Sequence, residues 1–407
     1  LLGALMENAE FPYSDKQKHA IACAARNGLV ILTGGPGTGK TTTVRGILQV
    51  FEALGLQALL AAPTGRAAKR LSDLTGMEAK TIHRLLEAGF AAGGRTAFAR
   101  NLTNPLECDA VILDEVSMVD IVLMQALIEA LPYGARLVLV GDADQLPPVG
   151  PGNFLRDVIA SHRVPTIGLT EIFRQAQQSD IVMNAHAGNA GQVPSRADGD
   201  FFWLKRSDPA SVIETVAQLC ASRLPSHYGL LPSQIQVLSP ARRQGSGTFA
   251  LNRRLQEALN PPSESKLEKR FGDWVFREGD RVMQVRNNYD IVWERMGGGE
   301  QGTGVFNGDV GEILQIFPQQ ECMTVRFDDR IATYTYDMLG ELELAYAVTV
   351  HKSQGSEFDA VVLALSDGLP RRLLTRNILY TAITRAKQLL VIVGSQNTVA
   401  YMVDNNQ

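Results

Sequence analysis

The sequence comprises 407 residues, of which 45% are hydrophobic and 20% are charged. This composition is typical of a globular chain with about two or three domains. The formal net charge of −4 excludes a uniformly basic chain, so any affinity for nucleic acid would have to come from a local groove. No apolar run approaches the ~20 residues of a membrane span, and no secretory signal is visible.

The start of the chain and its cysteines give two further expectations. The sequence begins at Leu1, and residues 1–9 have the pattern of the tail of a helix. We therefore expect that an N-terminal portion is missing from this sequence. The cysteines show no metal-ligand spacing, which favours free thiols in a cytosolic protein. They are Cys23, Cys108, Cys220 and Cys322.

A strand, a glycine-rich loop and a helix are predicted in succession near the start of the chain. Residues 28–33 form an apolar run typical of a buried strand, and residues 42–48 open a helical pattern. Between them, residues 34–41 read GGPGTGKT, a complete phosphate-loop motif in the context that it requires. A glycine-rich turn that serves only the fold is the alternative. The motif predicts binding of a nucleoside triphosphate by Gly35, Pro36, Gly37, Thr38, Gly39, Lys40, Thr41 and Thr42.

Two strand ends carry the chemistry expected of such a site. Lys40 would bridge the β- and γ-phosphates, and the Thr41 hydroxyl would ligate Mg²⁺. Residues 110–113 predict a second buried strand, which ends in the acids Asp114 and Glu115. In a phosphate-loop fold the first acid holds Mg²⁺, and the second is suited to deprotonate the attacking water. Solvated turn residues are the alternative for both acids.

Two more strands are predicted at residues 58–62 and 136–140. The later one runs into residues 141–149, where the amide of Gln145 is placed to sense the γ-phosphate, unless this turn has no role in nucleotide sensing. Successive strands joined by helical segments predict a doubly wound parallel sheet. In such sheets ligands bind beyond the carboxyl ends of the strands, where all these motifs fall.

Taken in order, the motifs resemble those of superfamily 1 helicases, specifically the RecD-like group with 5′→3′ polarity. The resemblance extends from about Tyr13 to Gly394. Besides the phosphate loop, it rests on residues 14–17, 62–68, 81–86, 114–115, 141–149, 169–175, 348–358 and 380–387. It implies ATP and Mg²⁺ as cofactors. Single-stranded DNA and junctions of single-stranded with duplex DNA are the implied partners.

The resemblance assigns further residues to the nucleotide. Gln17 would read adenine, and Glu357 lies in a motif that contacts both the DNA backbone and the nucleotide ribose. Arg174 and Arg385 resemble arginine fingers, which stabilise charge on a phosphate held by the other motor domain. A surface salt bridge is the alternative for Arg174. The implied catalytic set is Lys40, Asp114, Glu115, Gln145, Arg174 and Arg385, with Thr41 and Asp114 as metal ligands.

DNA contacts are implied at strand ends of both motor domains, where hydroxyl and basic groups suit phosphates. A basic, glycine-containing turn at residues 241–248 follows a predicted strand and could bind a backbone phosphate through Arg242. A solvated turn is the alternative for Arg242, and also for the pair His351 and Lys352. With Arg242 added from this turn, the whole predicted set is Pro63, Thr64, Arg66, Thr81, His83, Arg242, Thr349, His351 and Lys352.

The implied fold is α/β, with two RecA-like phosphate-loop NTPase motor domains. The first would cover residues 1–164 and include a small strand-separating hairpin at about 88–107. The second would cover residues 165–271 and 340–407. Between its two parts, short alternating strands with turn signals predict a small β-barrel at residues 272–339, which the resemblance makes SH3-like.

Three functions remain open from the sequence. The first is an ATP-dependent DNA helicase that translocates 5′→3′ on single-stranded DNA and unwinds duplex DNA in recombination or repair. It would be cytoplasmic and associated with the bacterial nucleoid, with no membrane partner. The second is a nucleotide-gated DNA-binding subunit of a larger recombination nuclease complex, whose other recombination and repair subunits would be partners. The third is an RNA helicase, because no reader of the 2′-hydroxyl is recognisable in the sequence.

Overall fold

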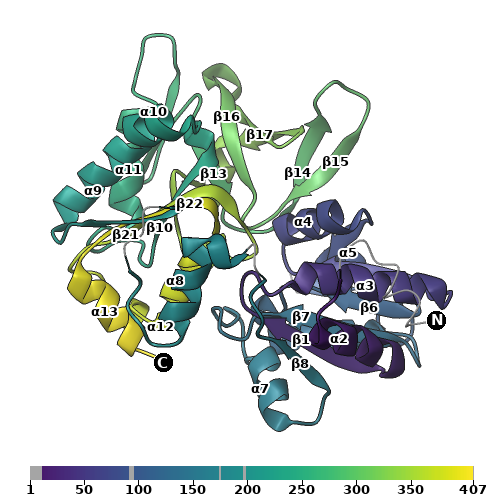
Figure 1. The fold of residues 1–407 in the computed structure, drawn as a ribbon. Coiled ribbons are helices and arrows are strands. Elements are labelled where there is room, and N and C mark those ends of the chain that lie inside the picture. Colours follow the sequence, from purple (N-terminus) through teal and green to yellow (C-terminus); the bar gives the residue numbers. More distant parts are fainter. Residues whose placement is uncertain (1–11, 91–95, 174–175, 196–198, 407) are drawn as a thin grey trace. The chain divides into compact units, whose positions relative to one another are not determined.

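The computed structural model describes residues 12–90, 96–173, 176–195 and 199–406. The chain divides into two compact units, Leu1–His186 and Ala187–Gln407. Figure 1 traces their elements in chain order. Within the described ranges, no helix combines the length and the apolar character needed to cross a bilayer.

The first unit is built on a six-stranded parallel sheet with the order β3-β2-β6-β7-β1-β8. Its strands are β1 Leu29–Gly34, β2 Ala58–Ala62, β3 Ala79–Thr81, β6 Ala110–Leu113, β7 Arg136–Gly141 and β8 Thr166–Leu169. Its helices are α2 Asp15–Arg26, α3 Lys40–Ala53, α4 Gly65–Thr75, α5 Ile82–Leu85, α6 Ile121–Ala130 and α7 Phe154–Ser161. The predicted parallel sheet is therefore confirmed.

Alternate residues of β1 enter two separate cores, as expected for a strand that is buried on both faces. Val30 and Leu32 pack in one core with Ile47 of α3. Ile31 packs in the other with Leu127 of α6. Helices therefore cover both faces of the sheet, and the carboxyl ends of its strands remain at one edge to carry loops.

Strand β8 and a short hairpin complete the first unit. Strand β8 pairs with β1, with Ile167 opposite Leu32. The segment just after residue 164, which was assigned to the second domain, thus contributes a strand to the first sheet, and the compact unit continues to His186. Strands β4 (Ala88–Phe90) and β5 (Thr96–Phe98) pair antiparallel within the range where a hairpin is expected.

The second unit contains a five-stranded parallel sheet with the order β20-β10-β21-β22-β9. The strands are β9 Phe201–Lys205, β10 Ile235–Ser239, β20 Ala347–Thr349, β21 Phe358–Leu365 and β22 Ala386–Gly394. Helices α9 and α11 lie on one side of this sheet and α12 and α13 on the other (Figure 1). The helices are α9 Pro209–Gln218, α10 Leu224–Tyr228, α11 Thr248–Leu259, α12 Arg376–Ile383 and α13 Gln396–Asp404.

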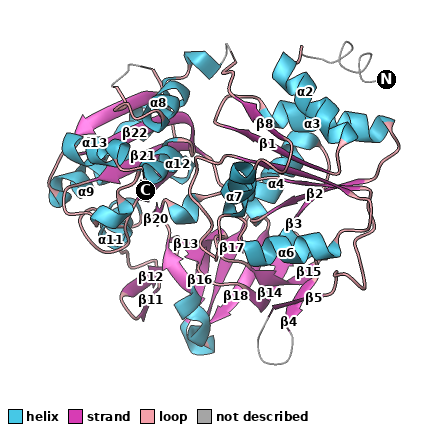
Figure 2. Cartoon of the chain, turned by 90° about the horizontal axis from the view of Figure 1, so that it is seen from below, coloured by secondary structure: helices cyan, strands magenta, loops and turns pink. Residues whose placement is uncertain are grey.

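Between α11 and β20 the chain forms a seven-stranded sheet with the order β15-β14-β18-β17-β16-β13-β19, whose pairs are antiparallel (Figure 2). Its buried residues, among them Ile313 and Tyr334, share one core with Val237 of β10. The insertion is therefore packed onto its host domain. The strands are β13 Arg281–Gln284, β14 Asn288–Arg295, β15 Gln301–Val305, β16 Val310–Phe317, β17 Cys322–Phe327, β18 Arg330–Thr335 and β19 Leu342–Leu344, preceded by a ribbon of β11 Glu268–Phe271 and β12 Trp274–Arg277.

Candidate functional site

The phosphate loop is the connection between β1 and α3. Gly37 and Gly39 have φ values of 73° and 79°, in the left-handed region that glycine enters without strain. Gly39 is also the N-cap of α3, so no side chain caps the first amides of the helix. Free backbone N–H groups and the partial positive charge at a helix start both favour an anion. The loop therefore has the geometry and the polarity of a phosphate site.

Lys40 is folded back onto the loop that precedes it. Its Nζ donates to the carbonyl oxygen of Gly34 and, at 3.0 Å, to that of Gly35. The hydroxyl of Thr38 also donates to the Gly35 oxygen, at 2.8 Å. Because a charged phosphate oxygen is a stronger acceptor than a carbonyl, a bound phosphate would draw the Lys40 ammonium away from these two acceptors.

Asp114 and Glu115 follow β6 in a largely buried setting. The backbone N–H of Glu115 donates to Asp114 Oδ1 at 2.8 Å, and Glu115 itself has a φ of 54°, which is uncommon for a non-glycine residue. Burial and the neighbouring Glu115 raise the pKa of the Asp114 carboxyl, while Arg70 and Lys40 oppose that rise. A divalent cation beside Asp114 would favour its ionised form.

Arg70 of α4 is a site residue that is not among those predicted from the sequence. Its Nη1 lies 3.3 Å from Glu115 Oε1, and the Glu115 side chain is only 10% exposed. The one local signal is that Arg70 lies four residues after Arg66 and therefore on the same face of the helix. Its pairing with an acid 45 residues away depends on the packing of α4 and cannot be read from a local pattern.

The end of β7 brings Gln145 to the same edge of the sheet. Its Nε2 donates to Asp142 Oδ2 at 3.5 Å, and the side chain is 8% exposed. A Cβ on Gly141 would lie 3.3 Å from the backbone nitrogen of Val116, so this glycine allows β7 to end close to the acidic segment. Because β6, β7 and β1 are parallel neighbours, the acids, the Gln145 loop and the phosphate loop converge.

The oxygen groups at this edge fit Mg²⁺. The Thr41 hydroxyl lies in the first turn of α3 and the Asp114 carboxylate at the end of β6. Hydroxyl and carboxylate oxygens are the hard ligands that Mg²⁺ prefers beside nucleotide phosphates. The residues predicted as metal ligands therefore have suitable chemistry.

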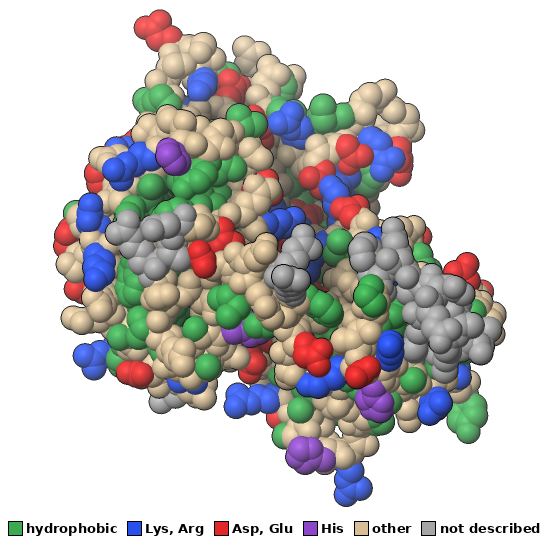
Figure 3. Space-filling view, in the orientation of Figure 1, with side chains coloured by type: hydrophobic (Ala, Val, Ile, Leu, Met, Phe, Trp, Pro, Cys, Tyr) green, Lys and Arg blue, Asp and Glu red, His purple; other side chains and the backbone are tan. Residues whose placement is uncertain are grey.

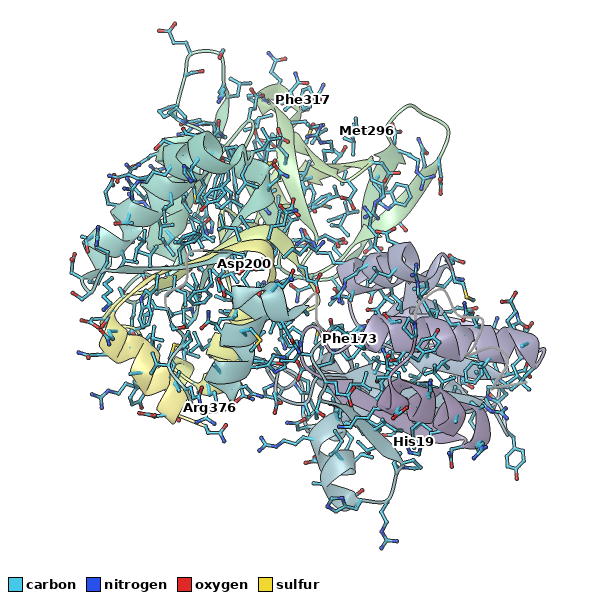
Figure 4. All side chains as sticks on the ribbon, in the orientation of Figure 1. His19, Phe173, Asp200, Met296, Phe317 and Arg376 are labelled. Atoms are coloured by element: carbon cyan, nitrogen blue, oxygen red, sulfur yellow. The ribbon has the colours of Figure 1, made fainter. Side chains whose placement is uncertain are left out.

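Gln17 and Phe173 lie beside the phosphate loop. Gln17 forms a capping box with Ser14 at the start of α2, and its Nε2 donates to the carbonyl of Gly39 at 3.2 Å. The N–H of Phe173 donates to the carbonyl of Gly37 at 3.2 Å, and a Cβ on Gly39 would lie 2.5 Å from the Phe173 ring. Figure 4 labels Phe173. Phe173 belongs to a predicted motif but has no predicted role, and its ring packs against Gly39 of the loop. Adenine reading by Gln17 stays a prediction.

Of the two predicted arginine fingers, only Arg385 lies among the residues that the structure describes. Arg174 lies outside the described residues. Arg385 is 2% exposed, and its guanidinium donates to the carbonyls of Thr381 and Ser356 and to the Thr384 hydroxyl at 3.1–3.2 Å. To reach a phosphate, Arg385 would have to exchange at least one of these partners. Glu357, predicted near the ribose, is half-buried just before β21.

In the first unit, the predicted DNA residues follow two neighbouring strands. Strands β2 and β3 are parallel, with Ala62 opposite Thr81, so the segments after them share one edge. Thr64 caps α4 and Thr81 caps α5, each through its hydroxyl oxygen. Burial lowers the pKa of His83, which favours a neutral ring at pH 7. Pro63 and Arg66 flank Thr64 and are half-buried.

In the second unit, three of the predicted DNA residues, Arg242, Thr349 and Lys352, line a cavity of about 400 Å³. Thr349 ends β20 opposite Ser239 of β10, and Arg242 follows β10. Arg242 Nη2 lies 2.5 Å from Glu343 Oε1, and burial lowers the pKa of the nearby Lys352. Burial likewise lowers the pKa of His351, which does not line the cavity. The polar lining comprises Arg242, Thr248, Asn252, Arg286, Glu343, Thr349 and Lys352.

Comparison with known families assigns three segments. Residues 17–151 match the AAA domain, residues 251–327 match the SH3 domain of ATP-dependent RecD-like DNA helicases, and residues 344–393 match the UvrD-like helicase C-terminal domain. The chain is 34% identical to the RecBCD enzyme subunit RecD of Mycobacterium tuberculosis, over 95% of this chain and 70% of that protein. The chain belongs to the RecD-like helicase family. The family resemblance seen in the sequence, including the SH3-like insertion, is confirmed.

Three further similar proteins bear on the extent of this RecD-like chain and on its fold. It is 38% identical to the ATP-dependent RecD2 DNA helicase of Deinococcus radiodurans over 96% of its own length, but it spans only half of that relative. A Bacteroides Pif1 helicase solved with ADP-AlF3 and single-stranded DNA matches 97% of the chain with a TM-score of 0.53 at 19% identity. Pif1 helicase from Candida albicans matches 96% with a TM-score of 0.52 at 17% identity. These structures share the fold of two RecA-like domains.

Within this RecD-like fold, the structure brings two groups of predicted site residues together. The phosphate loop, the acid pair and Gln145 converge in the first unit. Arg242, Thr349 and Lys352 surround one cavity in the second. The individual roles of these residues stay predictions.

Proposed function

We propose that the chain is an ATP-dependent DNA motor that translocates 5′→3′ on single-stranded DNA and unwinds duplex DNA in recombination or repair. The observation that carries this proposal is the convergence of the phosphate loop, the acid pair and Gln145 at one edge of a parallel sheet. The similarity to a RecD2 DNA helicase supports it. A motor of this kind would work in the cytoplasm at the nucleoid.

The residues of the first unit suffice to outline the hydrolytic step. Lys40 and the loop amides would bind the β- and γ-phosphates, and Thr41 and Asp114 would hold Mg²⁺, which neutralises phosphate charge when bound. Glu115 would accept a proton from the attacking water while the water oxygen forms a bond to the γ-phosphorus. The bond from that phosphorus to the β–γ bridging oxygen then breaks, giving ADP and phosphate. Gln145 would position the water or sense the phosphate.

DNA would be held through its backbone in both units. Hydroxyl and basic groups at strand ends contact phosphates and carry little sequence information, so we expect weak sequence preference. Arg242, Thr349 and Lys352 would form one such contact at the cavity of the second unit. Arg385 of the second unit, as an arginine finger, would link DNA binding to hydrolysis.

Steady-state ATP hydrolysis, with and without single-stranded DNA across a salt series, tests the proposal. We expect strong stimulation by DNA that fades as salt rises, since phosphate contacts release counterions. Unwinding should then require a 5′ tail rather than a 3′ tail. Lys40→Ala should abolish hydrolysis while it leaves DNA binding partly intact. ATP turnover by Lys40→Ala at the parental rate would show that the phosphate loop is not the catalytic site.

A second candidate is a nucleotide-gated DNA-binding subunit of a larger recombination nuclease complex. The similarity to RecBCD enzyme subunits favours it. In that case the isolated chain would bind nucleotide and DNA but would not unwind tailed duplexes, and partner subunits would be required. An RNA helicase would instead be stimulated by single-stranded RNA more strongly than by DNA, which the same assay measures.

A further inference from the structure

Helix α8 (Asp180–Asn189) crosses the division between the two compact units. The division falls after His186, so the first seven residues of the helix belong to the first unit and the last three to the second. A continuous helix transmits a displacement at one end to the other more directly than a flexible linker does. The contacts at each end therefore decide what α8 can couple.

The first part of α8, with the turn before it, packs on the phosphate loop. A Cβ on Gly37 would lie 2.6 Å from Ala176 Cβ and 3.2 Å from Val182 Cγ1. His186 Nε2 lies 3.0 Å from the carbonyl oxygen of Pro36. Any rearrangement of residues 36 and 37 as the loop closes on a phosphate would thus displace the residues of α8 that contact them.

The contact between His186 and Pro36 has a defined direction. A carbonyl oxygen only accepts, so Nε2 of His186 carries the proton and donates. His186 is half-buried. Unlike Ala176 and Val182, which only pack against the loop, it forms a hydrogen bond with a backbone oxygen of the loop. The bond therefore reports the position of the Pro36 carbonyl.

The other end of α8 is held within the second unit by Arg376 of α12, which Figure 4 labels. Its Nη1 donates to the carbonyl of Asn189 at 3.4 Å, and its Nε donates to the carbonyl of Val403 in α13 at 2.7 Å. A Cβ on Gly191, just beyond the helix, would lie 3.3 Å from Arg376 Nη2. The end of α8 is thus tied to both helices on one side of the second sheet.

We propose, building on the ATP-driven function proposed above, that His186 is a positioning residue that couples the phosphate loop to the second unit through α8. Nucleotide binding would move the Pro36 carbonyl, the hydrogen bond to His186 would move α8, and Arg376 would pass that movement to α12 and α13. His186 itself would not touch the nucleotide. Its loss should therefore uncouple DNA affinity from nucleotide occupancy while nucleotide binding persists.

The test compares His186→Leu with His186→Gln. Both variants replace the ring, but only glutamine can place an amide donor near the position of Nε2. Anisotropy with labelled oligo-dT gives the Kd for DNA with and without a non-hydrolysable ATP analogue and Mg²⁺. For the parent we expect the two Kd values to differ by roughly 5- to 150-fold, the usual range of coupling between sites. His186→Leu should bring the ratio close to 1, and His186→Gln should retain most of it.

Three measurements separate the possible outcomes. A fluorescent ADP analogue should bind His186→Leu within about threefold of the parent, and thermal midpoints should show that both variants fold. His227→Leu, at an exposed histidine of α10, is the matched control and should behave as the parent. A parental ratio in His186→Leu would overturn the coupling role while leaving the motor proposal intact. A parent that neither hydrolyses ATP nor binds DNA would instead refute the motor proposal, and the coupling with it.

Discussion

At the scale of single residues, several predicted DNA contacts also serve the fold. The hydroxyl oxygens of Thr64 and Thr81 accept the N–H groups of Ala67 and Arg84 and so cap α4 and α5. Each hydroxyl keeps its own proton, which can donate to a phosphate. Replacing such a cap typically costs about 1 kcal/mol of stability. A valine variant would therefore lose both the helix cap and the hydroxyl that could donate to a phosphate, so a loss of DNA binding could not be assigned to either one. A serine variant would keep both the cap and the hydroxyl.

Glu343 is the residue whose charge we expect to limit DNA affinity. It is paired with Arg242 in a cavity that Arg286 and Lys352 also line, so its carboxylate would compete with a DNA phosphate for these cations. Glu343→Gln should therefore strengthen binding of single-stranded DNA several-fold at low salt. The slope of log affinity against log salt should become steeper by up to about 1, for one additional phosphate contact.

The control for this prediction is Glu264→Gln, which removes the same charge at an exposed position of the same unit. It should leave both the affinity and the slope close to parental. Equal behaviour of the two variants would mean that Glu343 acts only through net charge, and the cavity would then not be a phosphate site.

At the scale of elements, local patterns predicted the fold well and long-range pairings less well. The succession of β1, the phosphate loop and α3 was predictable because periodicity and glycine spacing lie within about 20 residues. Membership of β8 in the first sheet was not, because it depends on pairing Ile167 with Leu32 across the domain. The contacts of Arg70 with Glu115 and of Phe173 with Gly39 likewise depend on tertiary packing.

The junction between the inserted sheet and its host depends on one buried carboxylate. Asp280, between β12 and β13, is fully buried and accepts hydrogen bonds from Gln256 and Asn260 of the α11 region, from the Arg277 N–H and from the Tyr346 hydroxyl, at 2.6–2.8 Å. Asp280→Ala would leave four donors without this acceptor, and a buried unsatisfied group costs about 1–3 kcal/mol. We expect the free energy of unfolding to fall by on the order of 3 kcal/mol.

Urea unfolding followed by tryptophan fluorescence measures this change, because Trp274 lies in β12. Asp290→Ala, at an exposed position of β14 in the same sheet, should change the free energy by less than about 0.5 kcal/mol. A similarly small effect of Asp280→Ala would show that water can replace the carboxylate and that the junction does not depend on it.

At the scale of the whole molecule, positive and negative charges nearly balance, with 39 Lys and Arg residues against 43 Asp and Glu residues. On the face shown in Figure 3, Lys and Arg side chains are interspersed with Asp and Glu, in line with the net charge of −4. If the chain is the proposed DNA motor, its affinity for nucleic acid would have to come from a few placed groups, such as those predicted at the cavity in the second unit. Contacts that are few and salt-sensitive would suit the proposed motor, because they can be broken at each step.

The division into two units also predicts how nucleotide should affect unfolding. The three tryptophans, Trp203, Trp274 and Trp293, all lie in Ala187–Gln407, so their fluorescence reports the second unit, while circular dichroism reports both. A nucleotide at about 100 times its Kd stabilises the unit that binds it by about 2.7 kcal/mol. A non-hydrolysable ATP analogue with Mg²⁺ should therefore raise the midpoint temperature of the unfolding transition followed by circular dichroism more than that of the transition followed by tryptophan fluorescence. If α8 couples the units, the smaller tryptophan shift should disappear in His186→Leu. Equal shifts by both probes in the parent would show that the two units unfold as one cooperative body.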